Sequence, residues 1–267
     1  MAIERIREYD QLPQEADWDT ASSLPDDWPS SGRLEMEQVS AKYRPNLPEA
    51  LSELNMVMKS GEKIGICGRT GAGKSTLASV ILRIIEPTKG KMRLDGVDTR
   101  IIGLQKLRSS ITIVPQDSVL FSGTVRFNLD PWHRETEEEL ATTLSKLGLS
   151  IQLDMLVTEG GANLSMGEKQ LLCLGRAILR KSKLLILDEA TSAMDIETDT
   201  KITELVAQEF SSCSVLTIAH RLSTVLSGDK ICVMEKGSIA EQGSPDQLMK
   251  DNQTKFYQMA KSSGLIH

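Results

Sequence analysis

The chain has 267 residues, 40% hydrophobic and 25% charged, which is the balance of an ordinary globular protein of one or two domains. A net charge of −6 and a pI of about 5.3 argue against nucleic acid as a partner, because such binding needs a basic face. No uncharged apolar run is long enough to cross a bilayer, and residues 1–9 lack the apolar core of a signal peptide.

The first part of the chain differs in composition from the rest. Residues 17–32 are rich in Pro, Ser and Asp, which favours an extended linker. Trp18 and Trp28 either dock on the neighbouring domain or anchor an exposed loop. We expect residues 1–32 to be a linker and residues 33–267 to form the folded domain.

Three short strands are predicted next, over residues 33–39, 50–58 and 62–67. A turn over residues 44–48 separates the first two strands, and Tyr43 stands just before it.

Residues 68–75, Gly-Arg-Thr-Gly-Ala-Gly-Lys-Ser, fit the phosphate-binding pattern G-x-x-x-x-G-K-[ST] at every fixed position. They follow a predicted strand and precede a predicted helix over 76–85. Glycines let backbone N–H groups curve around a phosphate, and the helix N-terminus adds partial positive charge. Lys74 would reach the terminal phosphates, and the Ser75 hydroxyl would ligate Mg²⁺. The pattern alone indicates a nucleoside triphosphate; a kinase, GTPase, helicase or transporter would fit it.

The middle of the chain is predicted to be mainly helical. A hairpin over 91–101 turns at Asp95-Gly96, and a strand over 111–114 ends at Pro115-Gln116. A helix over 136–147 has a capping box, stops at Gly148 and is followed by a second short helix. Because these helices interrupt the nucleotide-binding pattern, residues of about 125–180 are predicted to be an inserted subdomain.

The next helix, over 166–180, is opened by Leu-Ser-Met-Gly-Glu at residues 164–168. Ser165 is a natural N-cap and Glu168 completes a capping box, which explains the pattern by itself. The alternative is that this helix N-terminus also faces an anion.

The apolar strand over 184–188 ends in two carboxylates. A buried strand ending there places Asp188 at the carboxyl edge of the sheet, beside the phosphate loop, where it would hold Mg²⁺. Glu189 would polarise the attacking water, although a strand can also simply end in solvated acids.

Strands and helices alternate to the end of the chain. Further elements are predicted over 197–209 (helix), 215–219 (strand), 231–242 (hairpin) and from Ser244-Pro245 (helix). The fold class is therefore α/β, with a P-loop NTPase core of mainly parallel strands, antiparallel N-terminal strands and an inserted helical subdomain. The cysteines are scattered in apolar runs, which indicates reduced core residues in a cytosolic setting: Cys67, Cys173, Cys213 and Cys232.

Taken together, these motifs resemble the nucleotide-binding domain of the ATP-binding cassette (ABC) family, closest to the second cassette of the multidrug-resistance-associated, or C, subfamily. The resemblance runs from Leu24 to Tyr257 and rests on the stretches 68–75, 115–123, 128–131, 187–192 and 217–222.

The resemblance implies ATP and Mg²⁺ as cofactors. It assigns ATP contacts to Tyr43, Gly68, Arg69, Thr70, Gly71, Ala72, Gly73, Lys74, Ser75, Thr76, Gln116, Leu164, Ser165, Met166, Gly167, Glu168 and Asp195. It assigns Mg²⁺ to Ser75, Gln116 and Asp188. It assigns catalysis to Lys74, to Glu189 as general base and to His220 on the γ-phosphate. Taken singly, Tyr43, Gln116 and His220 have plain structural explanations, and His133 and His267 carry no motif.

The resemblance also implies partners. Residues 164–168 would cap ATP bound to a second cassette, and the helical subdomain and the Gln116 loop would contact transmembrane domains. The implied function is ATP-driven dimerisation that powers transport, with the cassette on the cytoplasmic side of a membrane. A regulatory module that gates a channel is the main alternative. Soluble ATPases of this kind usually carry a coiled-coil arm, a second cassette or a basic patch, and this sequence shows none of them. It also has no Asn-Lys-x-Asp motif, which a GTPase uses to read guanine.

The sequence departs from the family pattern in two places, and each departure bears on the expected function. Met166 and Glu168 stand where the signature usually has glycine and glutamine, and an acid near a γ-phosphate is unfavourable. We expect this signature to serve a weak or non-hydrolysing site, whereas Glu189 makes the chain's own site hydrolytic. The segment between Pro131 and Gly160 is shorter than usual, which bears on coupling to the membrane.

Overall fold

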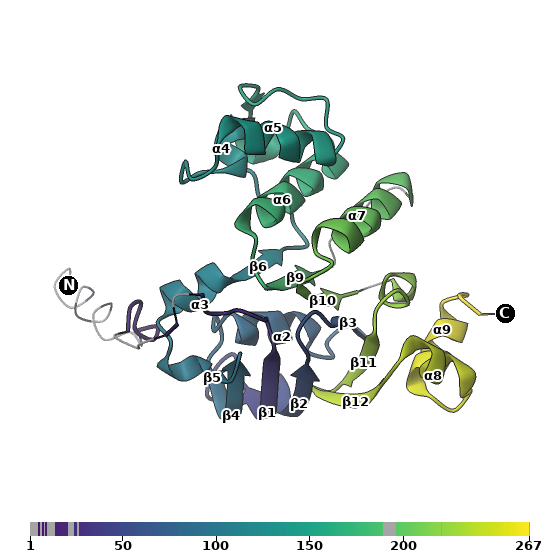
Figure 1. The fold of residues 1–267 in the computed structure, drawn as a ribbon. Helices are drawn as coiled ribbons and strands as arrows, with labels where there is room; N and C mark the ends of the chain where they lie inside the picture. The colour runs from purple at the N-terminus through teal and green to yellow at the C-terminus, as the bar shows by residue number, and fades with distance from the viewer. Residues whose placement is uncertain are drawn as a thin grey trace.

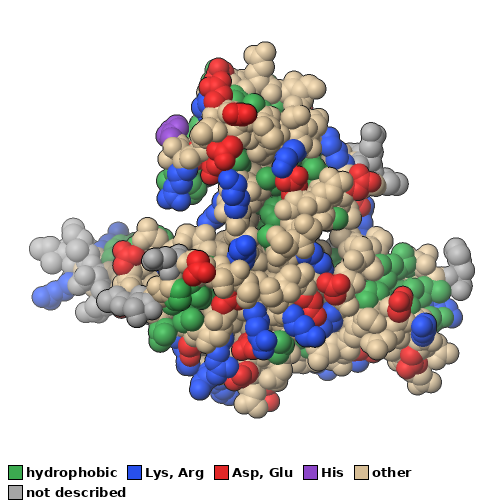
Figure 2. Space-filling view, in the orientation of Figure 1, with side chains coloured by type: hydrophobic (Ala, Val, Ile, Leu, Met, Phe, Trp, Pro, Cys, Tyr) green, Lys and Arg blue, Asp and Glu red, His purple; other side chains and the backbone are tan. Residues whose placement is uncertain are grey.

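The computed structural model describes most of the chain, and Figure 1 shows it as two lobes, β-sheets below and helices above. The described residues are 5, 7, 9, 14–20, 24–25, 27–188, 196–219 and 221–266, of which 196 and 197 are described by their backbone alone. Within these ranges, no helix is long and apolar enough to cross a membrane. On the face drawn in Figure 2, acidic and basic side chains are interspersed.

A six-stranded sheet forms the centre of the lower lobe, in the order β12-β11-β3-β10-β9-β6. All neighbouring pairs are parallel except β11 and β12, so the predicted mainly parallel sheet is confirmed. The central strands are buried along most of their length, as expected for a sheet covered on both faces. The strands are β3 (Lys63–Gly68), β6 (Ile111–Val114), β9 (Leu184–Asp188), β10 (Ser214–Ile218), β11 (Lys230–Glu235) and β12 (Ser238–Gly243).

A second, antiparallel sheet has the order β2-β1-β4-β5 and packs against the first through a shared apolar core. Its strands are β1 (Leu34–Ala41), β2 (Leu51–Met58), β4 (Pro87–Leu94) and β5 (Val97–Asp98). The predicted strand over 97–101 is wrong beyond Asp98. The Asp98 carboxylate accepts a hydrogen bond from the Arg100 amide, 3.0 Å away, and starts a 3₁₀ turn over Thr99–Ile101.

Helices cover the main sheet and build the upper lobe (Figure 1). They are α2 (Lys74–Ile81), α3 (Leu104–Ser110), α4 (Val125–Leu129), α5 (Glu137–Lys146), α6 (Met166–Arg180), α7 (Ile196–Glu209), α8 (Pro245–Lys250) and α9 (Lys255–Ser262), with 3₁₀ turns at Glu159–Gly161 and Leu222–Val225. The predicted bounds of α6 are confirmed at both ends.

One helix prediction was wrong in its bounds, and another was wrong altogether. The helix over 76–85 starts earlier and ends at Ile81, because Arg83 takes a left-handed conformation (φ 51°) and leaves Ile84 61% exposed. The short helix expected after Gly148 is absent from residues 149–158, where the chain instead forms β8 (Leu156–Val157) against β7 (Gly123–Thr124).

The upper lobe holds α4, α5 and most of α6, and it has an apolar core of its own that continues onto β9. Leu140 and Leu144 of α5 pack there with Leu171 and Leu174 of α6. The inserted helical subdomain expected from the sequence is therefore present.

The two tryptophans of the N-terminal region behave differently. Trp28 is 5% exposed, and its indole N–H donates to the carbonyl oxygen of Leu94, 3.2 Å away. Trp18 is 54% exposed. Of the two alternatives, docking therefore holds for Trp28, whereas the Trp18 side chain stays at the surface.

All four cysteines are buried and free, as predicted. Burial raises the pKa of the Cys67 thiol to about 12 and that of Cys232 to about 11. Because the thiolate is the reactive form, these side chains are inert members of the core.

The capping box predicted for α5 is confirmed, and it carries a pH prediction. The Thr136 amide and hydroxyl each donate to Glu139, at 3.0 Å, and these bonds lower the pKa of that carboxyl from 4.5 to about 2. The resulting stabilisation is present above pH 4.5 and is lost as the pH falls towards 2. We expect Thr136→Ala to raise the pKa of Glu139, as measured by NMR titration. The same variant should unfold in acid at a higher pH than the wild type. A wild-type Glu139 titrating near 4.5 would contradict the prediction.

Candidate functional site

The phosphate loop joins the end of β3 to the start of α2. Gly68, Gly71 and Gly73 have φ angles of 153°, 80° and 103°, which side chains rarely adopt. Space is short as well: a Cβ on Gly68 would lie 2.4 Å from the carbonyl oxygen of Met234. The pattern of glycines recognised in the sequence is thus required by the backbone path of the loop.

The turn between β11 and β12 supports this loop from outside. The Gly237 amide donates to the Ala72 carbonyl at 3.0 Å, and the Gly237 carbonyl accepts from the Ser52 amide at 2.9 Å. One turn therefore connects the phosphate loop to the antiparallel sheet. Lys236 and Gly237 both have positive φ, which confirms the predicted hairpin turn.

Lys74 lies within the loop and is 6% exposed. Its ammonium donates to the carbonyl oxygens of Gly68 (3.0 Å) and Arg69 (3.4 Å). The charge is thereby held within the loop, at the N-terminus of α2. This arrangement suits an anionic ligand, because a cation lies at a helix N-terminus that follows a glycine-rich loop.

Tyr43 is brought to the same place from the loop after β1. Its hydroxyl lies 3.0 Å from the Thr76 hydroxyl, and its side chain is 59% exposed. An exposed ring fixed beside a phosphate loop offers a flat apolar surface on which a base can stack.

The three predicted metal ligands lie where elements begin or end at one edge of the sheet. Ser75 is in the first turn of α2, Gln116 follows β6, and Asp188 ends β9. A hydroxyl, an amide and a carboxylate are oxygen donors of the kind that Mg²⁺ prefers, so these residues fit that ion. Among the described residues, no cluster of His, Cys, Asp or Glu suits a metal bound by protein alone.

The segment that carries Gln116 is fastened by side chains the sequence did not single out. Gln170 of α6 is 1% exposed; it donates to the Pro115 carbonyl at 3.2 Å and accepts from the Ser118 hydroxyl. Arg176, two turns on, donates to the Val119 carbonyl at 2.7 Å. In the sequence, Gln170 borders and Arg176 interrupts a mainly apolar stretch of α6.

The candidate signature, residues 164–168, leads into α6. Leu164 is buried, whereas Met166 is 55% exposed. The predicted capping box is confirmed: Glu168 accepts from the Ser165 amide and hydroxyl, both at 2.8 Å. Within the described residues, no hydrogen bond or ion pair joins this segment to residues 68–76.

Three predicted site residues lie outside the described ranges: Glu189, Asp195 and His220. Their roles remain those that the sequence predicts. Asp188, which precedes Glu189, ends β9. Ala219, which precedes His220, follows β10, and β10 is the strand between β9 and β3.

The sequence matches the family described as "ABC transporter" over residues 51–192, just over half of the chain. It is 47% identical over 272 residues to ATP-binding cassette sub-family C member 2 of Homo sapiens. It is 43% identical over 291 residues to Bile pigment transporter 1 of Saccharomyces cerevisiae. These matches cover 99% and 100% of the chain but 18% and 19% of the relatives, so the chain spans about a fifth of their length.

A solved structure agrees over nearly the whole fold. A bacterial Atm1-family ABC exporter with ATP bound matches with a TM-score of 0.89 and 30% identity. The match covers 98% of this chain and 47% of that one.

Proposed function

This chain belongs to the ABC transporter family, and on that premise we propose that it binds and hydrolyses ATP to drive transport across a membrane. The observation that carries the proposal is the phosphate loop with Lys74 inside it and Tyr43 bonded beside it. Together they offer a site for phosphates and a surface for a base.

In the proposed mechanism, Glu189 takes part in the chemical step, and the other residues bind or orient ATP. Lys74 exchanges its loop carbonyls for the terminal phosphates, and Tyr43 stacks on adenine. Ser75, Gln116 and Asp188 would hold Mg²⁺, which neutralises phosphate charge when bound. Glu189 takes the proton of the attacking water, and His220 contacts the γ-phosphate.

A second cassette is the proposed partner for the ATP site. Residues 164–168 present an exposed helix start that can cap ATP bound to another cassette. Because Glu168 places a carboxylate there, we propose that this signature serves a site of weak or absent hydrolysis. The Ser165 amide and hydroxyl both donate to this carboxylate.

Transmembrane domains are the proposed partners of the upper lobe. Four large apolar side chains are exposed around the segment fastened by α6: Val119, Phe121, Phe127 and Leu156. Such a patch next to Gln116 suits a docking surface. We propose that residues 1–32 link the cassette to a transmembrane domain, that the folded domain is 33–267 with its helical subdomain near 125–180, and that the cassette lies on the cytoplasmic side.

A regulatory role is the second candidate. In this role, ATP binding alone would switch an associated channel or protein. Intact ATP-driven dimerisation with absent hydrolysis would favour this reading over transport.

Adenine stacking on Tyr43 provides a test of the proposal. We expect Tyr43→Ala to weaken MgATP binding by the purified chain about tenfold, because stacking is worth about 1–3 kcal/mol per base. Isothermal titration calorimetry measures the affinity. Tyr43→Phe is the matched control, since it removes the bond to Thr76 and keeps the ring. Equal affinity in Tyr43→Ala and wild type would remove Tyr43 from the site, and no MgATP binding by the wild type would refute the proposed function.

A further inference from the structure

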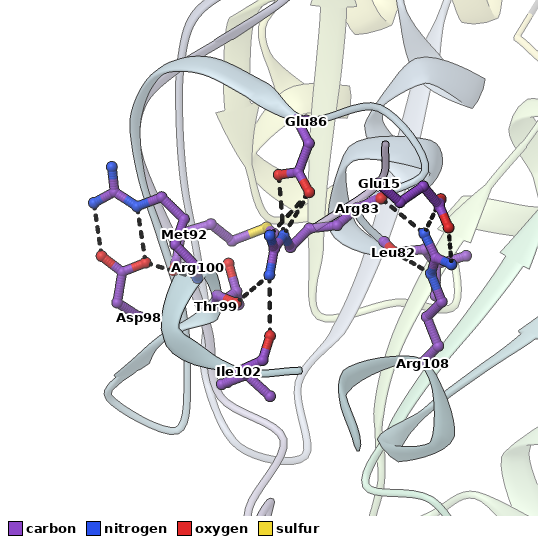
Figure 3. A network of polar contacts seen from close by, with 10 residues as sticks. All are labelled: Glu15, Leu82, Arg83, Glu86, Met92, Asp98, Thr99, Arg100, Ile102 and Arg108. Carbon is purple, nitrogen blue, oxygen red and sulfur yellow. Dashed lines mark hydrogen bonds and ion pairs between the residues drawn. The ribbon is translucent and has the colours of Figure 1, made fainter. Parts of the chain in front are cut away.

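The end of α2 far from the phosphate loop is held by an arginine from α3. Arg108 donates from Nε to the Leu82 carbonyl at 3.1 Å and from Nη2 to the Arg83 carbonyl at 2.9 Å (Figure 3). Leu82 is the C-cap of α2. Terminal carbonyls of a helix lack partners within it and carry partial negative charge, so a guanidinium there both pairs them and offsets the charge.

Arg83 fixes the same helix end from the other side. It is 4% exposed, and its Nη1 donates to the carbonyls of Thr99 (2.7 Å) and Ile102 (3.1 Å), while Nε binds Glu86. The guanidinium groups of Arg83 and Arg108 therefore both help to fix the position of this helix end (Figure 3).

The guanidinium of Arg108 is also bound by the N-terminal region. Glu15 accepts from Nη2 at 2.7 Å and from Nη1 at 3.2 Å, in the two-pronged geometry that orients an arginine. We call residues 14–20 the N-terminal strap. Its backbone carbonyls at Asp17 and Trp18 accept from the first amides of α3, at 3.1 and 3.0 Å.

The strap lies so close to α3 that one position must be glycine. A Cβ on Gly103 would come within 2.7 Å of the Trp18 carbonyl oxygen. The Thr20 hydroxyl adds a bond to the Ile101 carbonyl at 3.1 Å. The strap is thus docked along α3 by backbone and side chain, and the side of α3 it touches carries Arg108.

The other end of α3 is tied to the helix of the signature. Arg180, the last residue of α6, donates to the carbonyls of Arg108 and Ser109, both at 3.2 Å. Helix α3 is therefore hydrogen-bonded to the end of α2, to the last residue of α6 and to the strap.

We propose that Arg108 is a positioning residue for the phosphate loop, and that docking of the strap sets its guanidinium at the end of α2. The inference rests on the proposed function, because it concerns the same ATP site. Helix α2 has eight residues and spans about 12 Å at a rise of 1.5 Å per residue. Because packed interiors transmit displacement, a shift at Leu82 moves Lys74 and Ser75.

The test compares variants of the full chain by two readouts. Amide hydrogen exchange of α2 is measured without nucleotide, and MgATP affinity is measured by calorimetry. The variants are Glu15→Ala, Arg108→Ala, Arg108→Lys and the Glu15→Ala/Arg108→Ala double. Glu37→Ala is the matched control, because its pair with Arg93 (2.6 Å) is similarly exposed but lies in the antiparallel sheet.

We expect Glu15→Ala to speed exchange at the end of α2 and to weaken MgATP binding about two- to fivefold, the scale of an exposed ion pair. Arg108→Ala should weaken binding about tenfold, and the double variant no further. Arg108→Lys should not restore affinity, because an ammonium cannot reproduce the fork. Glu37→Ala should behave as wild type.

Either of two results would overturn the inference. In the first, every variant has the same amide exchange in α2 and the same MgATP affinity as Glu37→Ala. The other is faster exchange throughout the chain with unchanged affinity, which would make Arg108 a structural residue only. A wild type that binds no MgATP would instead refute the proposed function, while exchange in α2 would still decide whether the strap acts on that helix.

Discussion

Replacing Lys74 by alanine is expected to lower ATP hydrolysis about 10²- to 10³-fold, the usual cost of losing a positioned donor to developing charge. MgATP affinity should fall as well, because the ammonium contacts phosphate in the ground state. Lys74 is buried within the loop, and its ammonium is bonded to the carbonyl oxygens of Gly68 and Arg69. Calorimetry and phosphate release measure the two quantities.

Lys91→Ala serves as the control for Lys74→Ala. It removes an exposed lysine from β4, far from the loop, and both affinity and turnover should stay at wild-type values. If Lys74→Ala bound and hydrolysed ATP normally, the loop would not be the phosphate site.

The second large effect separates binding from turnover. Glu189→Gln is expected to keep MgATP affinity near the wild-type value and to lower turnover about 10²- to 10⁴-fold, because an amide cannot accept the proton of the attacking water. The residue follows Asp188, which ends β9 two strands from the phosphate loop. Single-turnover kinetics with the dimer in excess over ATP measure the chemical step.

Glu138→Gln is the matched control, since it neutralises an exposed carboxylate on α5. Normal turnover in Glu189→Gln would remove that residue as general base. Loss of MgATP binding would instead show that the carboxylate holds the site together, and the two variants Lys74→Ala and Glu189→Gln would then be indistinguishable.

The elements that the sequence predicted well are those specified by local pattern. The phosphate loop is one, because its glycines are demanded by backbone angles at Gly68 and Gly73. Helix α6 is another, because Ser165 and Glu168 mark its start by a bond between neighbours in sequence. Apolar alternation and apolar runs likewise located the strands.

The features that the sequence could not give depend on contacts between distant segments. Helix α2 stops at Ile81 because Arg83 finds partners in a turn that follows β5. Gln170 matters through the loop after β6, and Trp28 is buried in the apolar core with its indole N–H bonded to a carbonyl of β4. No periodicity records such pairings, since the partner is set by the folded chain.

The bond between Gly237 and Ala72 has a consequence for the order of synthesis. The phosphate loop leaves the ribosome before the turn that braces it and before β11, the strand beside β3, because both lie more than 150 residues further along the chain. Until they emerge, β3 has one edge without its neighbour, and the loop lacks its outer support. A nascent chain halted before residue 230 should therefore hold the complete nucleotide motif in its sequence and yet retain no nucleotide. Competence would appear only when the last part of the domain is released.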